Sequence, residues 1–378
     1  MPAYFALPQF PGCICFLREI VYKRKERSGL ADEKPHVCSA LGRTKVQSID
    51  ENRSSRYSAI AIASTWQFCA RLLGDVPART GTFRRRSRFL SYKTVGNTAL
   101  VLSNPVAAPA KRRALINRFV EEKGDVCFWQ ISRPVAEILA GLGCSINEMG
   151  TESHINLANY RFAGSAPAKR NLRRAYNRML DCGYTTRESP AASLNLQELE
   201  AISVKWRRTR SVTKREIMFL VRPIVLEDEP DVRKFFTFDR GGQLKAFAFF
   251  DPVYEGGEVV GYLCSTRRRL PEVDSLVGYA QLRHAMESFQ QEGERYLFLG
   301  LSPLANIKDQ EFAYNWLVRR TFRFAYANAF INRFLYPLQK LTKHKAAFAG
   351  TAAQSYYAFN RHPSVPRLIK VLRACTLI

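Results

Sequence analysis

Arginine gives this sequence its clearest chemical pattern. The segment 166–182 reads APAKRNLRRAYNRMLDC, and its basic and amide side chains recur at the spacing of one helix face, as Arg170, Arg173, Arg174, Asn177 and Arg178. A neighbouring apolar stripe consists of Leu172, Ala175, Tyr176 and Met179. Arginines on one face repel one another unless anions neutralise them, so the pattern favours a track for phosphates. A solvated basic face on a core helix remains the simpler alternative.

A second group of arginines, Arg267–Arg269, follows an apolar segment that ends at Ser265, in the sequence TRRRLPEVDSLVGYA. We expect a loop here that leads into a helix, with Gly278 near the helix start. A site for acyl-CoA would need a glycine-rich run at this point, so that backbone amides could approach the pyrophosphate. Because only Gly278 is present, these arginines would bind anions through their side chains.

The sequence carries no signature of nucleophilic catalysis. There is no G-x-S-x-G motif, and no Cys–His pairing can be read from the chain. The nine cysteines contain no C-x-x-C pair, so we expect no metal site. Among the histidines, we expect His154 and His284 to pack structurally. His344 lies between two lysines, so a basic contact patch and a structural role both stay open for it.

Strands and helices that alternate at short spacing must position these residues. Their pattern predicts an α/β fold with mixed sheets. The expected strands are Phe89–Tyr92, Thr98–Ser103, Val126–Ile131, Ser145–Gly150, His154–Leu157, Phe235–Asp239, Leu244–Pro252, Val259–Ser265 and Tyr296–Leu301. The expected helices are Ala110–Glu122, Val135–Leu142, Ala166–Cys182, Leu196–Arg208, Tyr279–Glu292, Gln310–Ala327, Phe330–Lys340 and Val365–Ala374.

The length and charge of the chain predict its domain organisation and the kind of partner that it binds. The 378 residues suggest a poorly ordered extension over 1–81, one α/β lobe over 82–215 and a second lobe over 216–378 that ends in a basic helix. A hydrophobic share of 46% excludes a wholly disordered chain or a collagen. The net charge of +25 predicts a polyanionic partner, either nucleic acid or an anionic membrane surface. Without an apolar run of about 20 residues, we expect a cytoplasmic protein, or one peripheral on the inner face of the membrane.

Short motifs occur in a characteristic order between about residues 82 and 360. They are VGNTALVLSNPV from Val95, FWQIS from Phe128, MGTE from Met149, the basic helix, LKAFAF from Leu244, FLGLSPL from Phe298, and KHK from Lys343 with Phe348 and Tyr356. Together they resemble the C-terminal catalytic domain of the phosphatidylglycerol lysyltransferase family, the aminoacyl-tRNA-dependent lipid aminoacyltransferases.

This resemblance implies two tandem GCN5-related N-acetyltransferase-like lobes around a central cleft, and no cofactor. Aminoacyl-tRNA would donate its aminoacyl group to the hydroxyl of a phosphatidylglycerol-like lipid at a membrane surface. Because the donor is an activated ester, positioning and charge stabilisation can suffice. The implied catalytic residues are Arg267 and Lys345. The implied substrate-binding residues are Glu152, Ser302, Lys343 and Tyr356, and Arg170, Arg173, Arg174 and Arg178 would bind tRNA phosphates.

The sequence departs from the family pattern at several positions, which keeps other functions open. Cys264 stands where the family usually has an aspartate, Thr151 replaces an acidic residue, and Thr351–Gln354 replaces a terminal tryptophan segment. One alternative is an N-acyltransferase that depends on acyl-CoA or an acyl carrier. Another is a binding module for RNA or membranes without catalysis. The amino acid, the lipid and the oligomeric state stay open.

Overall fold

The computed structural model describes residues 80–85, 88–164, 167–209, 224–229, 231–255 and 258–360, and all of them lie within one compact unit, Arg53–Leu377. The expected extension over 1–81, apart from its last two residues, and the helix at Val365–Ala374 lie outside these residues. None of the helices in the described ranges is long and apolar enough to cross a membrane.

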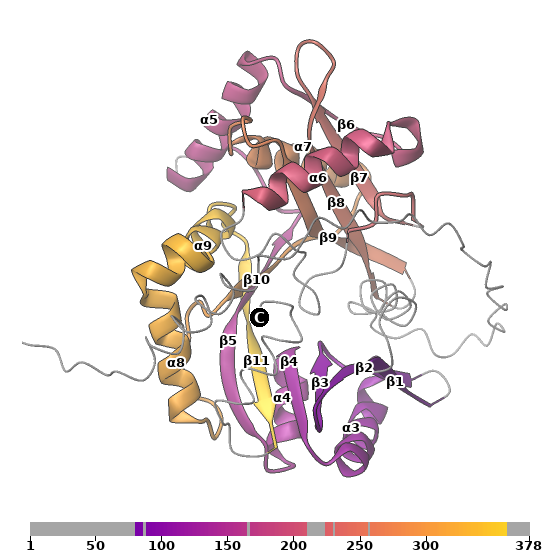
Figure 1. Cartoon of the computed structure of the whole chain (residues 1–378), viewed down its shortest axis with the longest axis vertical. Coiled ribbons are helices and arrows are strands. Elements are labelled where there is room, and N and C mark those ends of the chain that lie inside the picture. The colour runs from indigo at the N-terminus through magenta and orange to yellow at the C-terminus, as the bar shows by residue number, and fades with distance from the viewer. Residues whose placement is uncertain are drawn as a thin grey trace, which may run out of the picture. The chain divides into compact units, whose positions relative to one another are not determined.

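The described strands form one 11-stranded sheet in the order β1-β2-β3-β4-β11-β5-β10-β9-β8-β7-β6 (Figure 1). The strands are β1 (Thr80–Arg85), β2 (Arg88–Val95), β3 (Thr98–Leu102), β4 (Val126–Ile131), β5 (Ser145–Asn156), β6 (Thr185–Glu188), β7 (Arg233–Phe238), β8 (Leu244–Glu255), β9 (Glu258–Arg269), β10 (Tyr296–Pro303) and β11 (Thr351–Phe359). The helices are α3 (Pro109–Lys123), α4 (Arg133–Ala140), α5 (Pro167–Asp181), α6 (Leu196–Arg208), α7 (Val277–Gln291), α8 (Trp316–Ala327) and α9 (Leu338–Ala346), with a π-helical turn η2 at Ile331–Leu335.

One arrangement of strands occurs twice in this sheet. β2 and β3 are antiparallel, and β3 then runs parallel to β4 with α3 in the connection. In the same way β8 and β9 are antiparallel, and β9 runs parallel to β10 with α7 in the connection. The predicted mixed α/β fold is therefore confirmed, including its repeated unit.

The two halves of the chain exchange strands. β11, the last described strand, lies between β4 and β5, whereas β6 pairs with β7. The boundary at 215/216 stays a prediction, but strand pairing crosses it in both directions. As a result β5, β10 and β11 lie side by side at the middle of the sheet, where residues far apart in the sequence meet.

Glycine and proline explain two of the differences from the expected elements. Ser145–Gly150 and His154–Leu157 are not separate strands, because the chain continues through Gly150 as the single strand β5. Gly150 has φ of 137°, and a Cβ there would lie 2.3 Å from the carbonyl oxygen of Ser302. The expected helix Phe330–Lys340 is interrupted at Pro337, which precedes α9.

Other differences arise from capping and from pairing that local patterns do not reveal. The helix expected from Gln310 begins only at Trp316, because the side chain of Asn315 accepts hydrogen bonds from the amides of Leu317 and Val318. The expected loop after Ser265 is wrong, since β9 continues to Arg269. The strands β1, β6 and β11 have no counterpart among the strands expected from the sequence.

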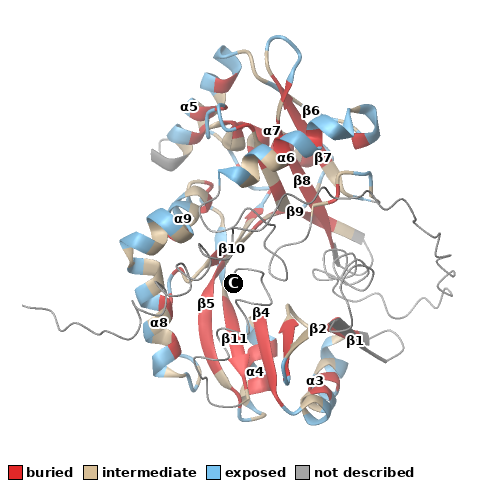
Figure 2. Cartoon of the chain, viewed as in Figure 1, coloured by how far each residue is buried: buried red, intermediate tan, exposed pale blue. Residues whose placement is uncertain are grey.

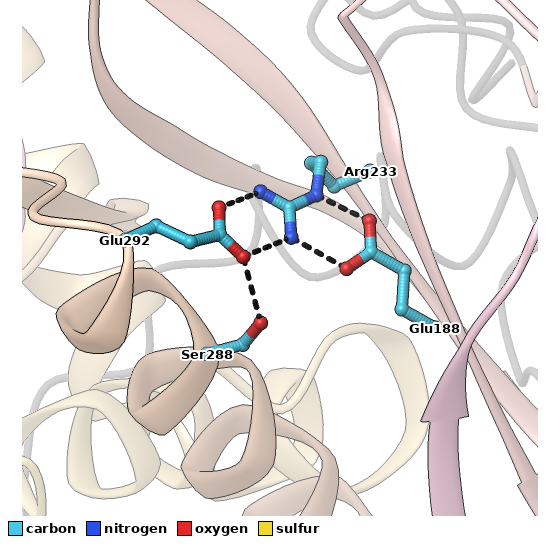
Figure 3. Close-up of polar contacts among 4 residues, drawn as sticks. All are labelled: Glu188, Arg233, Ser288 and Glu292. Atoms are coloured by element: carbon cyan, nitrogen blue, oxygen red, sulfur yellow. Dashed lines mark hydrogen bonds and ion pairs between the residues drawn. The ribbon is translucent and has the colours of Figure 1, made fainter.

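An ion-pair network fastens β6 and α7 to β7 (Figure 3). The guanidinium of Arg233 donates to both oxygens of Glu292, at 2.6 and 2.8 Å, and also to Glu188. Ser288 donates to Glu292 at 3.1 Å. Arg233 holds the pKa of Glu292 below its usual range, so this ion pair contributes stability at neutral pH and loses it as the pH falls through the range where Glu292 protonates.

Candidate active site

Three residues implied by the resemblance meet near the middle of the sheet. Glu152 lies on β5, Arg267 on β9 and Lys345 in the last turn of α9. The Lys345 ammonium donates a hydrogen bond of 2.6 Å to the carbonyl of Leu301 on β10, and Leu301 is the register partner of Glu152. Figure 1 shows α9 beside β10. We call Glu152, Cys264, Arg267, His344 and Lys345 the central cluster.

Lys345 is the buried cation of the cluster, with only 6% of its surface exposed. Burial, followed by repulsion from Arg267, lowers its pKa to about 8, while Cys264 and Glu152 act in the opposite direction. A lysine with this pKa is present in both protonation states near neutral pH. It can therefore accept a proton in one step and return it in another.

His344 holds Arg267 in place. Arg267 Nη1 lies 2.6 Å from His344 Nε2, and since a guanidinium has only donors, the imidazole accepts this hydrogen bond. Burial lowers the pKa of His344 to about 3, with further lowering by Arg267 and Lys345. The ring of Tyr279 lies against the imidazole at 4.4 Å between centroids. The basic contact patch considered for His344 is therefore wrong, because this histidine is neutral and directs an arginine.

Glu152 is the carboxylate of the cluster. Burial raises its pKa, whereas hydrogen bonds from Gln130 and Ser355 and the charge of Lys345 lower it. Ser355 Oγ lies 3.2 Å from Glu152 Oε1. Gln130 and Ser355 are not among the site residues predicted from the sequence. Gln130 carried a signal, as a polar residue within the apolar strand FWQI, but Ser355 gave none because β11 was not expected.

Cys264 contributes no negative charge of its own. Burial raises the pKa of its thiol, with Asp251 adding to this and Arg267 and Lys345 opposing it. Asp251 is 1% exposed on the adjacent strand β8. The cluster thus combines the cations Arg267 and Lys345 with the carboxylate of Glu152, and the Asp251 carboxylate acts on Cys264 from β8. Such an arrangement can bind an anionic group or stabilise an oxyanion.

Arg267 differs from the two arginines that follow it on β9. The guanidinium of Arg268 lies 3.8 Å above the ring of Trp206, and Arg269 donates to backbone carbonyls that include that of Leu270 at 3.2 Å. Successive side chains of a strand point to opposite faces, which separates Arg267 from Arg268. Gly278 lies in the first turn of α7, where a Cβ would be 3.5 Å from Arg267 Nη1.

The other residues implied as substrate-binding, Ser302, Lys343 and Tyr356, lie on three different elements. Ser302 is buried on β10 beside Leu301, and Lys343 is exposed on α9. Tyr356 packs in the core with α3 and α4, and its hydroxyl donates to Glu311 at 2.9 Å. Burial and Glu311 together raise the pKa of Tyr356. The structure thus places Ser302 next in sequence to the residue whose carbonyl Lys345 binds, and directs the Tyr356 hydroxyl to Glu311.

The basic helix is α5, and its predicted apolar stripe is confirmed. Leu172, Ala175 and Met179 are buried, and Tyr176 is partly buried against the same core. Arg170, Arg174 and Arg178 are exposed, with Arg178 lying 3.7 Å from Asp274. Arg173 instead donates to the carbonyl of Phe162 at 2.8 Å. The phosphate-binding role of this helix stays a prediction.

Comparisons with known proteins show the family and the fold of this chain. The family model described as "Phosphatidylglycerol lysyltransferase, C-terminal" matches residues 79–359. The structure of L-PGS from Bacillus licheniformis has a TM-score of 0.63 at 19% identity, covering 79% of this chain and 89% of that one. The C-terminal domain of a putative lysylphosphatidylglycerol synthetase from Agrobacterium fabrum has a TM-score of 0.65 at 17% identity, with coverage of 86% and 94%. These structures share the fold, and none of the curated proteins is detectably similar in sequence. The chain belongs to the phosphatidylglycerol lysyltransferase C-terminal family, a family of transferases.

Proposed function

We propose that this chain transfers an aminoacyl group from aminoacyl-tRNA to the hydroxyl of a phosphatidylglycerol-like lipid. One observation carries the proposal: a guanidinium held by a neutral histidine lies beside a lysine whose pKa is near 8. Membership of the family supports the lipid acceptor and the aminoacyl donor.

The reaction replaces one ester with another. The lipid hydroxyl attacks the aminoacyl carbonyl, and the neutral amine of Lys345 takes the hydroxyl proton. A bond forms between the carbonyl carbon and the lipid oxygen, and the negative charge on the carbonyl oxygen is stabilised by Arg267. The bond to the ribose oxygen then breaks, and the Lys345 ammonium returns the proton to that oxygen. The reaction needs no covalent enzyme intermediate, because the donor is already an activated ester.

Glu152 and α5 would position the donor. The Glu152 carboxylate is a suitable partner for the α-ammonium group of the aminoacyl moiety. The exposed arginines of α5 would hold tRNA phosphates, since the guanidinium fork matches their geometry. The net charge of +25 supports attraction of tRNA over a distance.

Variants of the two catalytic candidates test the proposal. We expect Arg267→Ala to lower the rate of transfer from labelled aminoacyl-tRNA to extracted polar lipid by about 10²–10³-fold, as loss of an oxyanion donor does. We expect Lys345→Met to lower it by about 10²-fold or more, as loss of a general base does. Arg118→Ala on the exposed side of α3 is the matched control and should leave the rate unchanged.

Two results would reject the proposed site or reaction. Full turnover by folded Arg267→Ala and Lys345→Met proteins would remove both residues from the chemistry. Saturable binding of CoA, with no transfer from any aminoacyl-tRNA, would favour the CoA-dependent alternative instead.

A further inference from the structure

Large apolar side chains are exposed mainly on one stretch of the chain, residues 314–336, which we call the aromatic stretch. Its exposed members are Tyr314, Trp316, Leu317, Phe324, Phe330, Phe334 and Tyr336. Elsewhere in the described ranges, the large hydrophobic side chains with comparable exposure are Leu180 and Leu196. Trp316 is 64% exposed and Phe330 56%. A concentration of this kind indicates a surface that contacts a partner.

The helical spacing of α8 explains why these side chains face outward. Val318 and Phe322, four residues apart, are buried in the core cluster that contains Met149 and Tyr357. By helical spacing Trp316, Arg323 and Phe324 lie on the opposite side, and all three are exposed. Figure 2 shows that α8 has both buried and exposed parts. The stretch continues into η2, where the rings of Phe330 and Phe334 lie 5.1 Å apart. Exposed apolar side chains therefore recur along the chain from α8 into η2, and those of α8 lie away from the face that holds it on the sheet.

Positive charge accompanies the aromatic stretch. Arg323, Arg333, Lys340 and Lys343 are exposed on α8, η2 and α9. Arg333 lies over the ring of Phe334, with its guanidinium carbon 5.2 Å from the ring centroid. The sequence contains no aspartate or glutamate after Glu311. The surface thus combines exposed aromatic rings with cations, and its own segment supplies no carboxylates to neutralise them.

We propose that the aromatic stretch, together with Lys340 and Lys343, docks this protein on the surface of an anionic lipid bilayer. Tryptophan, tyrosine and phenylalanine place an apolar ring at the level of the lipid headgroups, and lysine and arginine bind the anionic headgroups around them. This inference deepens the proposed function, because a lipid acceptor lies in the same bilayer, but its test needs no turnover.

The same observations argue against an RNA at this surface. Phosphates are held by cations and polar groups, and the exposed face of α5 offers Arg170, Arg174 and Arg178 for this purpose. The aromatic stretch adds the aliphatic Leu317 and a pair of phenylalanines to its cations. That composition suits insertion among lipid headgroups better than contact with phosphates alone.

α9 connects the proposed docking surface to the central cluster. Lys340 and Lys343 are exposed on this helix, whereas Lys345 is buried and His344 is partly buried against Arg267. A bilayer in contact with the exposed side would therefore lie one helix away from the residues that we place in the chemistry. Docking at this helix would bring a headgroup hydroxyl toward Lys345.

Vesicle binding by the full chain, without tRNA, tests this inference. We expect the protein to sediment with vesicles of phosphatidylcholine and phosphatidylglycerol in equal parts, and weakly with phosphatidylcholine alone. Phe330→Ala combined with Phe334→Ala should weaken binding about tenfold or more, because two rings no longer enter the headgroup region. Arg323→Glu combined with Lys340→Glu should weaken it at least as much.

Matched controls keep the result specific. Leu196→Ala removes an exposed apolar side chain on α6, and Arg113→Glu combined with Arg118→Glu makes the same charge change on α3. Both should bind vesicles as the unmodified chain does, and circular dichroism should show every variant folded.

Several outcomes would overturn the inference. Vesicle binding that the α3 charge change weakens as much as the change at Arg323 and Lys340 would indicate general charge attraction. Loss of tRNA binding, and not of vesicle binding, in the phenylalanine variant would assign the surface to RNA. A stable dimer that the same variant dissociates would assign it to a second copy of this chain.

Discussion

Among single residues, burial sets the protonation of two neighbouring side chains in the central cluster. His344 and Lys345 are consecutive in the sequence. His344 accepts a hydrogen bond from Arg267, and Lys345 donates one to the carbonyl of Leu301. Burial makes His344 neutral throughout the physiological range, so it serves as an acceptor for Arg267. Lys345 keeps a pKa near 8 and can exchange a proton. The two residues therefore have separate roles, one of positioning and one of proton transfer.

The pKa of Lys345 predicts how the rate depends on pH. Only the neutral amine can take the proton of the lipid hydroxyl, so kcat should rise with pH and level off above about 8. Lys345→Arg should remove this rise, because a guanidinium stays protonated. The profile is measured with excess aminoacyl-tRNA, corrected for spontaneous hydrolysis of the donor. A rate that stays flat between about pH 6 and 9 in the unmodified chain would exclude Lys345 as the base.

An aspartate in place of Cys264 should move the pH profile of kcat to higher pH. In Cys264→Asp a negative charge would join Arg267 and Lys345, and an opposite charge favours the protonated lysine. We expect the rise in kcat to move to higher pH by about one unit. Cys264→Ser introduces a polar group without charge and should leave the profile in place. A shift of equal size in both variants would contradict the electrostatic explanation.

At the element scale, β5 determines the geometry of the site, because it pairs with both β10 and β11. Its passage past β10 requires a glycine. In Gly150→Ala a Cβ would meet the Ser302 carbonyl oxygen at 2.3 Å, from a backbone with φ of 137°. We expect the free energy of unfolding to fall by about 3 kcal/mol or more, from the contact and the strained backbone together.

Gly143→Ala is the matched control for this change. Gly143 has a positive φ of 76°, but a Cβ there would meet nothing within 4 Å. In Gly143→Ala the free energy of unfolding should therefore fall by only about 1 kcal/mol, from backbone strain. Urea titrations of both variants measure the difference, and equal losses would show that the close approach to β10 does not matter.

Elements with a strong local pattern could be predicted from the sequence, whereas their assembly could not. Val126–Ile131 and Leu196–Arg208 have the predicted bounds, because apolar runs and helical spacing are local signals. β11 was missed, since its pairing partners on β4 and β5 lie about 200 residues away in the sequence. The candidate residues Arg267 and Lys345 came from the family resemblance, but the Arg267–His344 contact depends on how β9 and α9 pack.

At the scale of the whole molecule, charge is distributed over surfaces with different chemistry. The arginines of α5 form a polar basic face, and the aromatic stretch on α8 and η2 adds apolar rings to its cations. The central cluster lies between strands from both halves of the chain. This division suits a protein that must engage a soluble polyanion and a lipid surface together.

The basic face of α5 predicts the salt dependence of tRNA binding. A variant with serine at positions 170, 174 and 178 loses three exposed arginines, each expected to contact a phosphate. The slope of log K against log salt should become less steep by about 0.7–0.9 for each lost contact. Arg113→Ser combined with Arg118→Ser on α3 is the comparison. An unchanged slope in the α5 variant would place the tRNA elsewhere on the molecule.

Mass spectrometry of the lipid product shows whether this chain aminoacylates a lipid. The full chain is incubated with a pool of aminoacyl-tRNAs and vesicles that contain phosphatidylglycerol, and the extracted lipids are analysed. We expect a lipid heavier by one aminoacyl residue, which disappears when the tRNA is first treated with ribonuclease and when Lys345→Met replaces the unmodified chain. A folded protein that binds both tRNA and vesicles, yet yields no aminoacylated lipid from any donor in the pool, would contradict the proposed transfer.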